Sequence, residues 1–218
     1  MPRALFEKTG NAIWISHLDL MRLFQRAFKR AGLPLTHTQG FNPRPSVSIA
    51  LPLSVGVESV CELLDFDLDG VSVSCDEIKD RLNDALVEGV RVISVYDNGS
   101  KIKNLSLLRC VVTLEYDNGV PEGAAEQMKA LFARNVLMVE KKGKTGIVEQ
   151  DIISMIRSVE TRELPGEIEL EAVVCCQNPT LNPMQLSVAV TKYLPELTPD
   201  FAKCRRLEIY DINEKLFR

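Results

Sequence analysis

The two histidines of the chain, His17 and His37, carry the side chains best suited to acid–base chemistry. A neutral imidazole titrates near physiological pH, so either ring could act as a general base. Ser16 and Asp19 stand close to His17, but neighbours on one helical turn do not generally line up as nucleophile, base and orienting acid. We therefore interpret Ser16 as a helix cap. His17 and His37 are candidate catalytic residues, with a local capping or surface contact as the other interpretation of His17.

Metal and cofactor chemistry has little support in the residue pattern. The six cysteines include no Cys-x-x-Cys pair, and the adjacent Cys175 and Cys176 of a strand point to opposite faces. Asp65, Asp67 and Asp69 alternate at a strand end, where they could recruit a hard cation or form a solvated edge that discourages strand association. We expect no intrinsic metal site and no cofactor.

Charge is distributed unevenly along the chain. Residues 1–60 contain seven cationic and three acidic side chains, a net charge of +4, so the remaining residues carry −8 of the total of −4. Such an asymmetry bears on the partner that a surface attracts rather than on the fold. It predicts that the N-terminal half meets a polyanion or an acidic protein surface.

The segment from Gln39 to Pro45 joins polar and aromatic side chains in an irregular loop. Two prolines and a glycine stiffen it, which lowers the entropy lost on binding, and Phe41 offers a stacking face. Beside a basic helix, these residue types are typical of binding to single-stranded or looped RNA. The alternative is a structural turn with Phe41 in the core and a solvated basic face. The predicted RNA-binding residues are Arg22, Arg26, Lys29, Arg30, Gln39, Phe41, Asn42 and Arg44.

A second basic segment contains Lys141, Lys142 and Lys144. Its Gly-Lys-Thr resembles part of a phosphate-binding loop, but the full motif requires glycine where Met138 stands. We interpret the segment as a solvated loop that could contact nucleic-acid phosphates.

The elements that position these residues follow from the hydrophobic spacing. In the first half, Ala4–Glu7 and Ala12–Ile15 predict a hairpin, and a helix begins at Ser16 and ends at Gly32. Strands are then expected at Leu35–Thr38, Val47–Leu53, Cys61–Leu68 and Val90–Tyr96, with a helix at Cys75–Leu86.

The second half follows a linker-like patch at residues 97–101. Alternation restarts at Leu107, and the later pattern predicts helices at Pro121–Arg134 and from Asn182 or Pro183 to Tyr193. Extended or mixed segments are expected at Val136–Glu140, Ile147–Val159, Ile168–Cys175 and Cys204–Tyr210. The economical architecture is α+β, with two ferredoxin-like α/β-sandwich halves and antiparallel sheets, as domains of residues 1–98 and 104–218.

Two long motifs, FEKTGNAIWISHLDLMRLFQRAFKRAGLPL at 6–35 and TQGFNPRPSVSIALPLSVGVESVCELLDF at 38–66, resemble the radical-SAM-linked protein family, also called the domain-of-unknown-function 2344 family. The second half resembles the family more loosely, at residues 141–151 and 178–183. The resemblance implies a companion linked to, or fused with, a radical-SAM enzyme that carries the iron–sulfur chemistry.

These observations predict a non-catalytic accessory protein of a radical-SAM enzyme that binds RNA, either tRNA or ribosomal RNA. The alternatives are an RNA-processing or RNA-modifying enzyme with a histidine base, and a protein–protein adaptor without nucleic acid. No apolar run approaches the roughly 20 residues needed to span a bilayer, and no signal segment precedes the first strand, so we expect a cytoplasmic protein with no membrane contact.

Overall fold

The computed structural model describes residues 1–143 and 146–218. The chain divides into two compact units. The first contains residues 1–103 together with Arg218, and the second contains residues 104–217.

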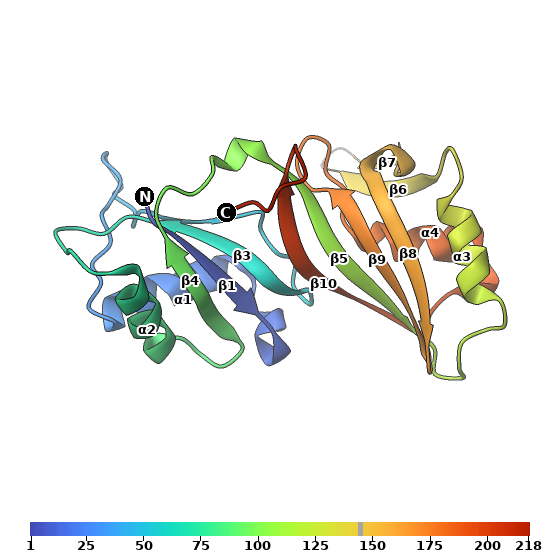
Figure 1. Cartoon of the computed structure of the whole chain (residues 1–218), viewed down its shortest axis with the longest axis horizontal. Coiled ribbons are helices and arrows are strands. Elements are labelled where there is room, and N and C mark those ends of the chain that lie inside the picture. The colour runs from blue at the N-terminus through green and yellow to red at the C-terminus, as the bar shows by residue number, and fades with distance from the viewer. Residues whose placement is uncertain (144–145) are drawn as a thin grey trace. The chain divides into compact units, whose positions relative to one another are not determined.

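The first unit alternates strands and helices in the order βαββαβ (Figure 1). Its strands lie in the order β4-β1-β3-β2, and each strand runs antiparallel to its neighbours. The elements are β1 (Arg3–Lys8), the short 3-10 helix η1 (Gly10–Trp14), α1 (His17–Arg30), β2 (Val47–Ala50), β3 (Glu58–Phe66), α2 (Cys75–Ala85) and β4 (Val90–Tyr96).

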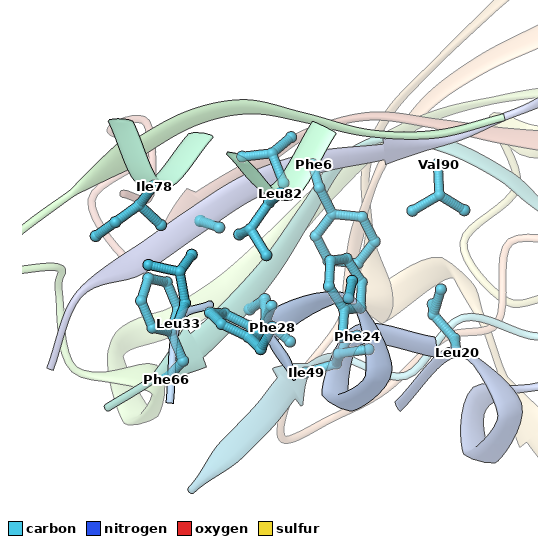
Figure 2. Packing of buried hydrophobic residues seen from close by; sticks show 14 of the residues in the cluster. Phe6, Leu20, Phe24, Phe28, Leu33, Ile49, Phe66, Ile78, Leu82 and Val90 are labelled. Carbon is cyan, nitrogen blue, oxygen red and sulfur yellow. The ribbon is translucent and has the colours of Figure 1, made fainter. Parts of the chain in front are cut away.

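One hydrophobic core joins both helices to the strands of this unit. Phe6 of β1 packs edge-on against Phe24 of α1, with 4.8 Å between ring centroids (Figure 2). Phe28, one turn further along α1, lies 4.9 Å from the ring of Phe66 in β3. Phe24 and Phe28 are four residues apart and therefore lie on the same face of α1. Because that face is buried, the opposite, cationic face of the helix is exposed to solvent.

Two predicted strands of the first half are wrong. The segment predicted as the strand Ala12–Ile15 is mostly the 3-10 helix η1, because Gly10 turns the chain with φ 54° and Lys8 holds the turn. The Lys8 ammonium donates to the carbonyls of Ile13 and Ile15 at 3.0 and 2.7 Å. The predicted strand Leu35–Thr38 forms only isolated bridges. Leu35 pairs with Leu68, whereas His37 pairs with Pro45, so the segment has no continuous partner strand.

The second unit repeats the order βαββαβ, with a hairpin inserted after its first helix. Its strands lie in the order β10-β5-β9-β8 and are again antiparallel. The elements are η2 (Ile102–Asn104) at the boundary, β5 (Leu105–Glu115), α3 (Ala124–Phe132), β6 (Met138–Gly143), β7 (Gly146–Asp151), η3 (Ile153–Met155), β8 (Ile156–Leu164), β9 (Glu167–Cys175), α4 (Gln185–Tyr193), η4 (Pro195–Leu197) and β10 (Phe201–Asp211).

The predicted α+β class with antiparallel sheets is therefore confirmed. No helix in residues 1–143 and 146–218 is both long and apolar enough to cross a membrane.

Candidate functional site

Helix α1 begins at a well-formed cap. The Ser16 hydroxyl accepts a hydrogen bond from the Asp19 amide at 3.2 Å and donates one to the Asp19 carboxylate at 2.7 Å. The predicted start of the helix is thus confirmed. The cap supplies a partner for the Asp19 amide, one of the first-turn N–H groups that have no acceptor within the helix.

Three arginines of α1 line one groove, which we call the arginine groove. Arg22, Arg26 and Arg30 are spaced four residues apart, so they lie on the same side of the helix. The groove has a volume of about 380 Å³ and is completed by Ile15, Asp19, Leu23 and Val87.

Two of these arginines also have partners within the protein. Arg22 pairs with the Asp19 carboxylate at 2.9 Å, and both side chains are exposed. The hydrogen bond from Ser16 and the bond from Arg22 hold the pKa of Asp19 below its ordinary value. Arg30 donates to the carbonyl of Ala85 at the end of α2. With one carboxylate against three guanidinium groups, the groove keeps an excess of positive charge.

A second cavity, which we call the loop pocket, lies on the neighbouring side of α1. Its volume is about 450 Å³, and most of its walls are apolar. It is lined by Gln25, Phe28, Lys29, Gly32, Leu33, Pro34, Leu35, His37 and Pro45. The last turn of α1 and the base of the following loop therefore build this pocket together.

The predicted loop has a closed base and an exposed tip. The Thr38 amide donates to the Arg44 carbonyl at 2.8 Å, and the Arg44 amide donates to the Thr38 hydroxyl at 3.0 Å. Between them Phe41 is fully exposed, so the alternative that placed this ring in the core is wrong. An exposed aromatic face on a closed loop is available for stacking.

The eight predicted RNA-binding residues thus fall into three groups rather than one surface. Arg22, Arg26 and Arg30 line the arginine groove, and Lys29 lines the loop pocket. The loop residues are all exposed, and they are Gln39, Phe41, Asn42 and Arg44.

Several lining residues of the cavities were not among the predicted site residues, and the polar Gln25 and the distant Val87 are examples. Gln25 precedes Lys29 by one helical turn, a spacing that could have identified it.

The two histidines occupy different environments. His17 is half-buried, and its Nδ1 is buried without a hydrogen-bond partner among the described residues. His37 is exposed and lines the loop pocket. His17 is the first residue of α1 and lines neither of these two cavities, whereas His37 follows the helix and lines the loop pocket.

The described residues of the second basic segment lie on the strands of a β-hairpin. Lys141 and Lys142 lie on β6, which pairs with β7, whereas Lys144 falls outside the described residues. Lys192 of α4 bonds Glu149 of β7 at 2.9 Å, and the Tyr193 hydroxyl donates to the Met138 carbonyl at 3.0 Å. Helix α4 therefore anchors the base of the hairpin.

The acidic strand end has structural partners. Asp65 accepts two hydrogen bonds from Arg3, at 2.6 and 3.0 Å, and Asp67 accepts one from the Thr36 hydroxyl at 3.1 Å. Within the part of the chain that the structure describes, no three His, Cys, Asp or Glu residues gather as metal ligands.

These features define a class: an α+β protein of two βαββαβ units, the first of which carries a basic helix between two cavities. The chain belongs to the family described as uncharacterized protein conserved in bacteria (DUF2344), whose model matches residues 2–183. No curated protein matches the chain.

Among solved structures, the chain is similar to one from a Cbf5-Nop10-Gar1 complex, with a TM-score of 0.51 and 9% identity over 95% of this chain and 48% of that one. For an archaeal box H/ACA sRNP Nop10-Cbf5 complex the TM-score is 0.46, with 9% identity over 94% and 46% of the two chains. The chain therefore spans about half the length of these solved chains. At this identity the first likeness shows a common fold and nothing of activity.

Proposed function

We propose that the protein binds RNA through the basic face of α1 and the loop that follows it. The observation that carries this proposal is the arginine groove, which is lined by three guanidinium groups of one helix and by one carboxylate, that of Asp19. Guanidinium groups bind phosphate oxygens with two hydrogen bonds, which suits the backbone of a nucleic acid. The exposed ring of Phe41 would stack on an unpaired base, and Gln39 and Asn42 would bond bases or ribose.

In the same proposal the protein is a non-catalytic companion of a radical-SAM enzyme and presents tRNA or ribosomal RNA to it in the cytoplasm. The support is the resemblance of residues 6–66 to radical-SAM-linked proteins. We further propose that the two βαββαβ units are ferredoxin-like domains, of residues 1–98 and 104–218.

The RNA part is tested by removing two exposed cations of the groove. We expect Arg22→Ala/Arg26→Ala to weaken binding to total cellular RNA by at least tenfold at low salt, because a single hydrogen bond to a charged group contributes about 1.5–3 kcal/mol and about 1.4 kcal/mol is tenfold. The slope of log affinity against log salt should fall by about 1.4, since two single-strand phosphate contacts are lost. Fluorescence anisotropy across a salt series measures both quantities.

The matched control removes two exposed cations of the second unit, as Lys129→Ala/Arg157→Ala. It makes the same change in net charge away from the groove, so affinity and slope should stay near those of the unaltered protein. Equal losses of affinity in both variants would show that the effect comes from the net charge of the protein rather than from the groove. Absence of RNA binding at low salt would overturn the proposal.

The accessory role is tested by purification of the tagged protein from its native cell with and without nuclease. A radical-SAM enzyme retained after nuclease treatment is bound directly, whereas one released by nuclease is held through RNA. Recovery of no such enzyme in either case would contradict the proposed partner.

A further inference from the structure

We propose that the loop pocket receives one unstacked base of the bound RNA, and that Lys29 contacts the phosphate beside it. This inference rests on the proposed RNA binding and adds a site for a single nucleotide. It assigns a role to Gln25 and His37, which line the pocket together with Lys29.

The walls suit a flat heterocycle. Pro34 and Pro45 supply apolar surface that a ligand can reach, whereas the buried Phe28 and Leu33 belong to the core at the back of the pocket. A volume of about 450 Å³ lies within the range of small-molecule pockets, which combine apolar walls with a few placed polar groups. A base has this character, because its faces are apolar and its edge carries donors and acceptors.

The polar groups match the edge of a base and the charge of its phosphate. The amide of Gln25 offers both donors and an acceptor, and the imidazole of His37 offers two ring nitrogens for hydrogen bonds. No carboxylate lines the pocket, so Lys29 gives it a positive charge. The Lys29 ammonium makes no hydrogen bond or ion pair within residues 1–143 and 146–218, which leaves it available for an anion. A nucleotide supplies the flat edge and the anion together.

The pocket is held open by backbone contacts of its own walls. The Leu33 amide donates to the Phe28 carbonyl at 2.9 Å, and the Pro34 carbonyl accepts from Asp69 at 2.9 Å. Leu35 bridges to Leu68 and His37 to Pro45, so both sides of the loop base are tied. Walls fixed before binding lose little entropy when a ligand enters.

The pocket also stands in the right place relative to the arginine groove. Gln25 and Lys29 form one stripe along α1, and Arg22, Arg26 and Arg30 form the neighbouring stripe. A strand that crosses the exposed ridge of α1 can therefore rest its phosphates on the arginines while one base turns into the pocket.

The test compares two single-stranded RNA decamers, one with all its bases and one with abasic sugars throughout. We expect the unaltered protein to bind the complete decamer at least about tenfold more tightly, since seating and stacking of a base contribute on this scale. Gln25→Ala/His37→Ala should reduce this preference several-fold, leave the part that stacking on Phe41 supplies, and keep the salt slope. Arg22→Ala/Arg26→Ala should reduce the slope and keep the preference. Thermal unfolding verifies that each variant is folded.

Each outcome separates the pocket from the general RNA proposal. If the protein binds both decamers equally, or if the pocket variant keeps the full preference, the base pocket is overturned while phosphate binding stands. If neither decamer binds, the proposed RNA function fails, and free nucleoside monophosphates are titrated against backbone NMR signals of residues 28–37. Shifts that Gln25→Ala/His37→Ala abolishes would then support a nucleotide pocket without RNA, and their absence would overturn it.

Discussion

At the scale of single residues, side chains of the same type on the same helix make different contacts. Arg26 and Arg30 are both exposed cations of α1, but Arg30 also bonds the last turn of α2 through the Ala85 carbonyl. The basic face was predictable from helical spacing. The engagement of Arg30 was not, because its partner lies 55 residues away and is a backbone atom.

Lys8 is the side chain that departs furthest from its expected surroundings. It is 1% exposed, although lysine is almost never fully buried unless its ammonium is partnered. Its bonds to the carbonyls of Ile13 and Ile15 fold the chain just before α1 begins. The side chain is therefore part of the support of the candidate site rather than of its charge.

We expect Lys8→Met to lower the free energy of unfolding by at least about 2 kcal/mol, because two carbonyls lose their donor and each unsatisfied buried group costs about 1–3 kcal/mol. Urea denaturation measures the change. Lys101→Met, at an exposed position, is the control and should leave the unfolding midpoint unaltered. A Lys8→Met protein as stable as the control would mean that the turn before α1 does not depend on the ammonium.

At the scale of elements, prediction succeeded where local signals and burial agree. The Ser16 cap and the apolar stripe predicted helix α1 correctly. The predicted helix Cys75–Leu86 likewise agrees with α2 to within one residue. Prediction failed at Ala12–Ile15, where a buried ammonium supplied from β1 selects a 3-10 turn. A contact of that kind has no signature in the local pattern.

The two caps of the first unit offer a matched comparison. Ser16 and Ser74 each accept from the amide three residues on, at 3.2 Å in both cases. We expect Ser16→Ala and Ser74→Ala each to cost about 1 kcal/mol of stability in urea denaturation. RNA affinity of Ser16→Ala should stay within about twofold, because Arg22 and Arg26 lie beyond the first turn. A tenfold loss of affinity would instead place the first turn of α1 in the binding surface.

At the scale of the whole molecule, charge and pattern could be predicted further than the shape of the site. The α+β class and the cationic N-terminal half follow from composition and periodicity. The separation of the cationic face into a groove and a pocket could not be predicted in this way. Val87 and Leu33, which line the two cavities, come from segments whose positions are determined only when the core folds. The sequence thus predicted which residues form a candidate site but not their division between the groove and the pocket.

The charge asymmetry predicts which amides RNA will protect from hydrogen exchange. The amides of α1 are already protected by the helix, so the exposed loop at residues 38–44 should report binding most clearly. We expect slower exchange there on addition of total RNA, and no change in residues 156–218. Residues 156–218 contain eight cationic and ten acidic side chains, a net charge of −2, so they lack the positive excess that attracts a polyanion to the N-terminal half.

The same experiment decides the role of the β6–β7 hairpin, measured by mass spectrometry of peptides from residues 138–151. If Lys141 and Lys142 contact phosphates, the hairpin should be protected along with the loop, and its protection should vanish first as salt is raised, because contacts by flexible lysines are chiefly electrostatic. Arg22→Ala/Arg26→Ala should weaken protection of the loop at a fixed RNA concentration. Protection of the hairpin alone, with the loop unaffected, would move the binding surface from the first unit to the second and contradict the assignment to α1.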